Sequence, residues 1–229
     1  MSLALKGMDA LMTLRESHRD VGKKIHSACG GHYSPMDSLS VVALDRSMHN
    51  FDAFVSLLGQ DNGQCAVVIL RAQLDTLLRY FAHTLFPDPH QFAENVFNGV
   101  QIRKMKDPNP APADKKGEDP NLNDGYLKMK FGEIHDWIPD LYDQCCAFAH
   151  FSNQHCWAFV SKCKNVDSET GERDTAIGSK DDLSKQDQKK LIDAFWSVTQ
   201  LLFQQIEAWA SRERAADGEV TRRYRNVIK

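Results

Sequence analysis

The chain has 229 residues and a formal net charge of −3 at pH 7, with 42% hydrophobic and 26% charged residues. This is enough for one substantial core, and the slight negative charge argues against a general nucleic-acid binder, which needs an excess of Lys and Arg. No stretch approaches 18 uninterrupted apolar residues, so we expect no transmembrane helix and no membrane partner. A single domain over residues 1–229 is therefore predicted.

The first three predicted elements are long helices joined by short turns. Apolar side chains recur at helical spacing over residues 3–28, which end at a glycine pair, and over 34–59, which open with Ser-Pro and end with Gly. The third helix is predicted over residues 65–86, after an Asp-Asn-Gly turn. Because these connections are short, we expect the helices to pack as antiparallel neighbours.

The helix predicted over residues 65–86 combines an apolar face with a ladder of charge. Arg71, Asp75 and Arg79 are spaced by four and form a stripe that begins at the edge of that face. Since a charge beside a core needs a partner, one interpretation is structural, with Arg71 paired to a carboxylate or carbonyl of another helix. The other is anion binding by Arg71 and Arg79. The apolar face consists of Val67, Leu70, Leu74, Leu77, Leu78, Phe81 and Leu85.

The middle of the chain predicts less regular structure. Residues 90–104 indicate a shorter fourth helix. Residues 107–125 hold four prolines, many charges and few apolar side chains, which is typical of a mobile loop that serves as a connector or as a lid.

The last third predicts two further helices and a hairpin. A helix rich in small and aromatic residues is expected over 138–151, and a weak alternation over 156–177 predicts a small β-hairpin. Ser184, with Asp187 three residues later, marks the start of a long final helix. The basic tail, residues 213–229, is expected to be a frayed terminus, the alternative being contact with phosphate.

A second candidate site lies where the helix over residues 138–151 ends. Asp143 and His150 are seven residues apart and so lie on the same side of that helix. With an unperturbed pKa of about 6.5, His150 could act as acid or base near neutrality, or it could simply cap the helix. The candidates for ligand or partner binding around this helix end are Tyr142, Asp143, His150, Asn153 and His155.

The sequence predicts neither a metal site nor a cofactor. His150, His155, Cys156 and Cys163 are suitable zinc ligands, but their spacings of five, one and seven match no common zinc pattern. The chain contains no GxxxxGK[ST], HExxH or GxSxG motif and no Rossmann glycine pattern. Its six cysteines include no CxxC, so we expect reduced thiols and a cytoplasmic location.

Two segments carry a resemblance to known families. The run AVVILRAQLDTLLRYFA, followed by a polar loop and LYDQCCAFAHFSNQH, resembles bacterial helical domains of unknown function whose core helix reads like LxRxxxE and whose later helix ends in His. The resemblance covers residues 48–160 and places Asp75 at the acidic position and His150 at the histidine. These domains are distantly similar to HEPN domains (helical domains of higher eukaryotes and prokaryotes), many of which are dimeric ribonucleases.

The HEPN resemblance implies an active site in which an Arg precedes the His by four to six residues at a dimer interface. Here those preceding positions hold no Arg, so Arg71 or Arg79 would have to supply the cation. It further implies a ribonuclease of a defence or toxin–antitoxin system, in which His150 assists attack by the RNA 2′-hydroxyl.

These patterns predict a mainly α fold, an up-and-down bundle of four to five long helices with a small β-hairpin in the C-terminal third. The function we expect is that of a cytoplasmic, homodimeric interaction module, which binds a partner through a groove that holds Asp143 and His150. The alternative is a HEPN-like ribonuclease, so the partner is either protein or RNA.

Overall fold

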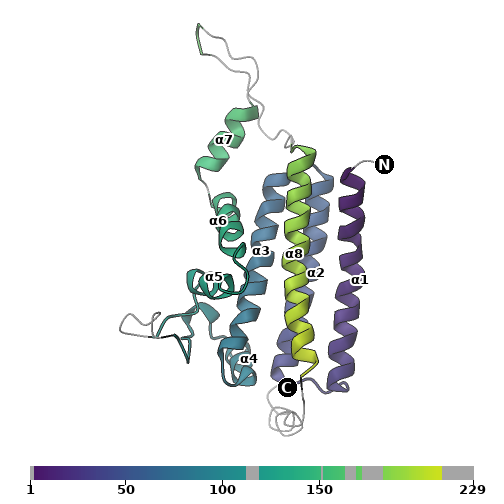
Figure 1. Ribbon diagram of the computed structural model, residues 1–229, viewed down its shortest axis with the longest axis vertical. Coiled ribbons are helices and arrows are strands. Elements are labelled where there is room, and N and C mark those ends of the chain that lie inside the picture. The colour runs from purple at the N-terminus through teal and green to yellow at the C-terminus, as the bar shows by residue number, and fades with distance from the viewer. Residues whose placement is uncertain (1–2, 112–118, 151, 163–168, 172–182, 213–229) are drawn as a thin grey trace.

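The computed structural model describes residues 3–111, 119–150, 152–162, 169–171 and 183–212 (Figure 1). The chain is mainly helical, as predicted, and within the described residues the pairing of extended backbone is limited to one isolated bridge between Lys106 and Asn121. The α-helices are α1 (Leu3–Cys29), α2 (Pro35–Gly59), α3 (Gly63–Phe81), α4 (Pro89–Phe97), α5 (Asp124–Gly132), α6 (Ile138–Ala149), α7 (Asn153–Lys162) and α8 (Lys185–Ala210), and the 3-10 helices are η1 (Ala82–Leu85) and η2 (Ile102–Lys104).

The long helices α1, α2, α3 and α8 lie side by side, and α4, α5 and α6 flank them (Figure 1). Successive helices α1, α2 and α3 alternate in direction, whereas α8 runs the same way as α1 and α3. In a simple up-and-down bundle, which the sequence predicted, α8 would run antiparallel to α3. The reason is that α5, α6 and α7 carry the chain back to the end of the bundle where α3 begins.

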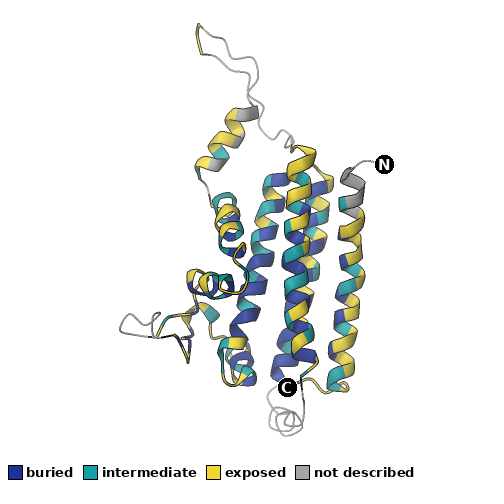
Figure 2. Cartoon of the chain, in the orientation of Figure 1, coloured by how far each residue is buried: buried dark blue, intermediate teal, exposed yellow. Residues whose placement is uncertain are grey.

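The core lies between the long helices, with α3 in contact with α2, α5, α6 and α8. Leu70, Leu74 and Leu77 of α3 are at most 1% exposed, and dark blue positions line the inner faces of the bundle in Figure 2. Burial of one such side chain contributes about 1.5–3 kcal/mol. The apolar pattern of α3 therefore fixes it as the central helix.

A chain of hydrogen bonds crosses this core and takes one buried side chain from each long helix. His18 Nδ1 donates to the Leu14 carbonyl oxygen (2.7 Å), which leaves Nε2 to accept from Ser47 Oγ (2.9 Å). Gln73 Nε2 then donates to Ser47 Oγ (2.7 Å) and to Thr199 Oγ1 (3.2 Å). Because each group has a partner, the network fixes the register of the four helices.

Two predicted helices end earlier than the sequence suggested. The third gives way to a 3-10 turn after Phe81, and the fourth stops at Phe97 instead of reaching Lys104. Gly99 has a φ of 84°, a left-handed conformation that cannot continue a helix. After Gly99, the helical residues of the predicted range 90–104 are those of the 3-10 turn η2.

The predicted β-hairpin is wrong where the structure can test it. Asn153–Lys162, which includes the residues read as its first strand, forms helix α7. A short alternation of apolar residues suits a strand or a helix, and here it was misassigned. The remainder of the expected hairpin lies largely outside the described residues, at 163–168 and 172–177.

Both ends of the proline-rich segment are anchored. Leu122 N donates to the Met105 carbonyl oxygen (2.8 Å), and the Tyr126 hydroxyl donates to buried Asp107 (2.7 Å). Mobility was predicted for the whole loop over residues 107–125. Residues 112–118 of that loop, and the predicted frayed tail at 213–229, lie outside the described part of the chain.

Candidate functional site

The charge ladder of α3 lies at the junction of α3 with α5 and α6. Arg71 is only 14% exposed, and its guanidinium lies over the Tyr142 ring with 3.8 Å between Cζ and the ring centroid. The guanidinium also donates to the Tyr142 hydroxyl, to Cys146 Sγ (3.2 Å) and to Asp124 (3.3 Å). Arg71 thus has the interhelical carboxylate partner that its place beside the core requires.

Asp75 and Asp124 are each shared between arginines. Arg79 donates from Nε to Asp75 (2.8 Å) and from Nη2 to Asp124 (2.6 Å). Arg71 lies 3.8 Å from Asp75, and Arg46 of α2 lies 3.6 Å from it on the other side. We call the following six residues the arginine cluster: Arg46, Arg71, Asp75, Arg79, Asp124 and Tyr142, whose ring and hydroxyl contact Arg71. Its three cations and two anions leave one excess positive charge.

Burial shapes the electrostatics of this cluster. Burial alone would lower the pKa of Arg71, but the bond to Cys146 and the neighbouring Tyr142 and Asp75 raise it overall. Burial raises the pKa of the Tyr142 phenol, opposed by the Arg71 charge, and it raises the pKa of the Cys145 thiol to about 12. Arg71 therefore stays a cation and Tyr142 a neutral phenol at physiological pH, a pairing that clamps α6 to α3.

The residues predicted near the end of α6 lie on different parts of the surface. Asp143 is exposed and is bound by Lys128 of α5 (2.7 Å). His150 is the exposed C-cap of α6, and its backbone N–H donates to the Cys146 carbonyl oxygen (3.1 Å). The Cys146 thiol accepts a hydrogen bond from Arg71 of α3, and His150 follows Cys146 by four residues, about one helical turn along α6.

Asn153 and His155 belong to α7. Asn153 is exposed, whereas the His155 ring packs on Phe148 with 5.9 Å between centroids, and its Nδ1 accepts from Ser152 N (3.3 Å). The structure therefore groups Arg71, Asp75, Arg79 and Tyr142 in the arginine cluster. His150, Asn153 and His155 lie instead at the α6–α7 junction.

The sequence interpretation missed the apolar surface of α7. Trp157 is 67% exposed, Phe159 43% and Val160 36%. A helix prediction for residues 153–162 would have placed Trp157 and Val160, three residues apart, on the same side of that helix. In the structure, α7 projects beyond the end of the bundle and its principal contacts are with α6 (Figure 1).

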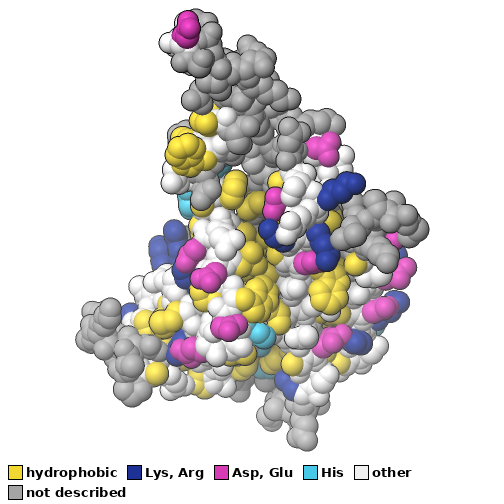
Figure 3. Space-filling view, turned by 45° about the horizontal axis from the view of Figure 1, so that its top comes forward, with side chains coloured by type: hydrophobic (Ala, Val, Ile, Leu, Met, Phe, Trp, Pro, Cys, Tyr) yellow, Lys and Arg dark blue, Asp and Glu magenta, His cyan; other side chains and the backbone are white. Residues whose placement is uncertain are grey.

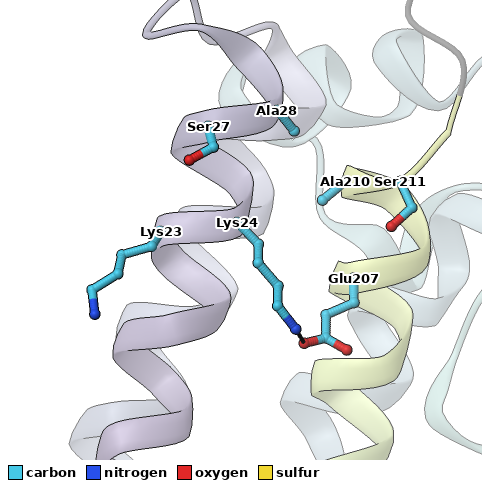
Figure 4. Close-up of a pocket in the computed structure, with 7 residues that line it drawn as sticks. All are labelled: Lys23, Lys24, Ser27, Ala28, Glu207, Ala210 and Ser211. Atoms are coloured by element: carbon cyan, nitrogen blue, oxygen red, sulfur yellow. Dashed lines mark hydrogen bonds and ion pairs between the residues drawn. The ribbon is translucent and has the colours of Figure 1, made fainter.

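A separate cavity of about 480 Å³ lies between the C-terminal parts of α1 and α8 (Figure 4). Lys24 of α1 and Glu207 of α8 form an ion pair across it. Its other lining residues are Lys23, Ser27, Ala28, Ala210 and Ser211, so none of the candidates predicted from the sequence contributes to it.

The described residues were also considered for two general features, a metal site and a membrane-spanning helix, and they contain neither. In that part of the chain, no three His, Cys, Asp or Glu side chains are grouped closely enough to hold a metal ion. None of the helices in the same residues has the length and apolar character needed to cross a membrane. Comparisons with protein-family models, curated proteins and solved structures give no match to this chain.

Proposed function

We propose that this chain is a cytoplasmic protein-interaction module that acts as a homodimer, with α7 as the contacting element. The observation that carries the proposal is the exposure of Trp157, Phe159 and Val160 on a helix that projects from the bundle. Trp157 and Val160 are three residues apart and lie on the same side of α7, and exposed apolar side chains that gather on one surface mark interaction sites. Trp is among the residues that contribute most binding energy at interfaces.

The surroundings of α7 support this role. His155 packs on Phe148, and Ser152 Oγ donates to the Ala147 carbonyl oxygen, so the junction with α6 is held while the apolar side chains stay exposed. Together with His150 and Asn153, the α6–α7 junction supplies polar groups at the rim of that surface. An apolar centre with a polar rim is the usual anatomy of a protein interface.

The cytoplasmic location is supported by the thiols at the arginine cluster. Cys146 accepts a hydrogen bond from Arg71, and Cys145 beside it is a buried free thiol. Both arrangements use reduced cysteines, which a cytoplasm maintains.

The experiment is sedimentation equilibrium of the full chain and of Trp157→Ser. We expect a dimer for the natural sequence and a dissociation constant raised roughly 30-fold in the variant, the effect of losing about 1 kcal/mol from each of the two copies. Trp196→Ser is the matched control, because Trp196 is a 40% exposed Trp on α8 and not on α7. A monomer at about 100 μM would refute the proposed dimer, since a stable homodimer associates well below that concentration.

A second candidate, a HEPN-like ribonuclease, has one observation in its favour. The Arg71 guanidinium of α3 binds Cys146 of α6, and the exposed His150 follows Cys146 by one helical turn. The test is cleavage of a single-stranded RNA by the purified protein. Loss of cleavage in His150→Ala, with retention in the neighbouring control His155→Ala, would support this function, and cleavage that survives His150→Ala would refute the mechanism.

A further inference from the structure

The cavity between α1 and α8 lies at the end of the bundle opposite α7 (Figure 1). The two helices run in the same direction, so their C-terminal ends lie side by side there. About one turn before each end, Ile25 and Ile206 are fully buried, whereas the cavity itself is lined by the smaller Ala28 and Ala210. Small side chains at both helix ends thus leave an opening of about 480 Å³, a volume within the range of small-molecule sites.

The charged groups that face each other across this cavity are one cation and one anion. Lys24 Nζ of α1 donates to Glu207 Oε1 of α8 (2.5 Å), and the two side chains point toward each other in Figure 4. Lys23 points away from α8 in the same view, and its ammonium donates to Asp20 (2.9 Å). A ligand in the cavity therefore meets one positive and one negative side chain.

Glu207 stands at a position where a helix disfavours an acidic residue. It lies in the last turn of α8, at the negative end of the helix dipole, and the end of α1 beside it adds a second partial negative charge. Its ion pair with Lys24 is exposed, at 60% for the Lys24 side chain and 35% for that of Glu207, and exposed pairs contribute little to stability. The pair can therefore open at little cost, and Glu207 together with the two helix ends favours a cationic group.

The wider surface does not select a ligand by the sign of its charge. The described acidic and basic side chains are interspersed on the face shown in Figure 3, so the local pair decides which charges are recognised. A simple anion would be attracted by Lys24 and repelled by Glu207, and the reverse holds for a simple cation. A molecule that carries both charges can pair with both side chains.

We propose that the cavity between α1 and α8 binds a small zwitterion of the α-amino acid class. Its carboxylate accepts from Lys24 and its ammonium donates to Glu207, so that the ligand replaces one exposed ion pair by two. Its apolar part faces Ala28 and Ala210. This site goes beyond the proposed function and is independent of it, because α7 lies at the opposite end of the bundle.

The experiment uses L-alanine as the probe, because it carries both charges and a single methyl group. Propionate lacks the ammonium and ethylamine lacks the carboxylate, so these two compounds are matched controls. The full chain, labelled with ¹³C in its alanine methyl groups, is titrated by NMR at constant ionic strength. We expect the Ala28 and Ala210 signals to shift with a dissociation constant on the order of 1 mM, and propionate and ethylamine to bind about tenfold or more weakly. Ala66, a buried residue near the start of α3 at the other end of the bundle, should not shift.

Variants then test the residues assigned to the site. Lys24→Met and Glu207→Gln each remove one charge and should raise the dissociation constant for L-alanine about tenfold or more. Ser27→Phe adds a ring at an exposed position of the cavity wall, leaves both charges in place and should abolish binding. Arg15→Met is the control, because it removes an exposed ion pair of α1, with Asp52, that does not line the cavity. It should leave the dissociation constant unchanged, and circular dichroism establishes that each variant is folded.

The outcomes distinguish a zwitterion site from other kinds of site. Equal affinities for propionate and L-alanine would show an anion site, equal affinities for ethylamine and L-alanine would show a cation site, and either result overturns the proposal. Ala28 and Ala210 signals that do not move with L-alanine overturn it as well, because L-alanine carries every group that the cavity is proposed to recognise. Binding that survives both Lys24→Met and Glu207→Gln refutes the assignment of the two side chains. None of these results bears on the dimer, which is tested separately through Trp157.

Discussion

Replacement of Arg71 by Ala tests whether the arginine cluster clamps α6 and α5 to α3. The substitution removes the guanidinium over the Tyr142 ring and its bonds to the Tyr142 hydroxyl and Cys146. A partly desolvated cation–π contact is worth about 1–2 kcal/mol, and the lost hydrogen bonds add about 1 kcal/mol. We therefore expect the free energy of unfolding to fall by roughly 2–3 kcal/mol.

We expect no larger loss of unfolding free energy, because the Asp75 and Asp124 carboxylates each keep a partner. Arg79 remains 2.8 Å from Asp75 and 2.6 Å from Asp124, so no buried anion is left uncompensated. Removal of one partner from an isolated buried pair would instead cost about 3–5 kcal/mol. A loss of that size would show that Arg79 does not hold the two carboxylates.

Urea unfolding followed by circular dichroism measures the effect. Arg46→Ala is the matched control, because Arg46 approaches the same Asp75 from α2 but is 56% exposed, and exposed pairs contribute at most about 1 kcal/mol. With a slope of about 2–3 kcal/mol per molar urea, Arg71→Ala should lower the midpoint by about 1 M. Equal midpoints for the two variants would refute the clamp.

Three further predictions concern the core and the helix ends. Burial lowers the pKa of His83 to about 4, so between pH 6.5 and 4 the unfolded chain binds a proton that the folded chain does not. The free energy of unfolding should therefore fall by roughly 2 kcal/mol between pH 7 and pH 5. Urea titrations at these two pH values should show a smaller difference for His83→Gln. Gln73→Leu leaves the core hydroxyls and the Asn50 amide without their partner and should cost about 2 kcal/mol in the same assay; a neutral result would contradict the network. Gly132→Ala should lower the melting temperature, since its Cβ would lie 2.6 Å from Pro139 Cγ, whereas Gly59→Ala, with open space around it, should raise it slightly.

Local patterns in the sequence were sufficient to predict the long helices. The apolar spacing of α3 predicted its central place, and Ser184 caps α8 as its spacing from Asp187 indicated. The direction of α8 could not be predicted, because it depends on where the intervening helices deliver the chain. The hairpin prediction failed because a short apolar alternation does not distinguish a strand from a helix such as α7.

Only part of the candidate site could be predicted from the sequence, because sequence patterns report local structure. Spacing by four predicted that Arg71, Asp75 and Arg79 form a stripe, which is a local property of one helix. Their remaining partners are distant in the sequence: Asp124 is 53 residues and Tyr142 71 residues from Arg71. Only the packing of α5 and α6 on α3 shows which of many acidic and aromatic residues complete the cluster.

The position of α6 connects the arginine cluster to the proposed dimer. This helix leads directly into α7, the proposed contacting helix, so the position of α7 depends on the Arg71 clamp. Arg71→Ala should therefore lower the urea midpoint and weaken the dimer together. Trp157→Ser removes an exposed side chain and should weaken the dimer with little change in the urea midpoint measured at a concentration where the protein is monomeric. An Arg71→Ala protein that dimerises normally would show that α6 keeps its position without the clamp.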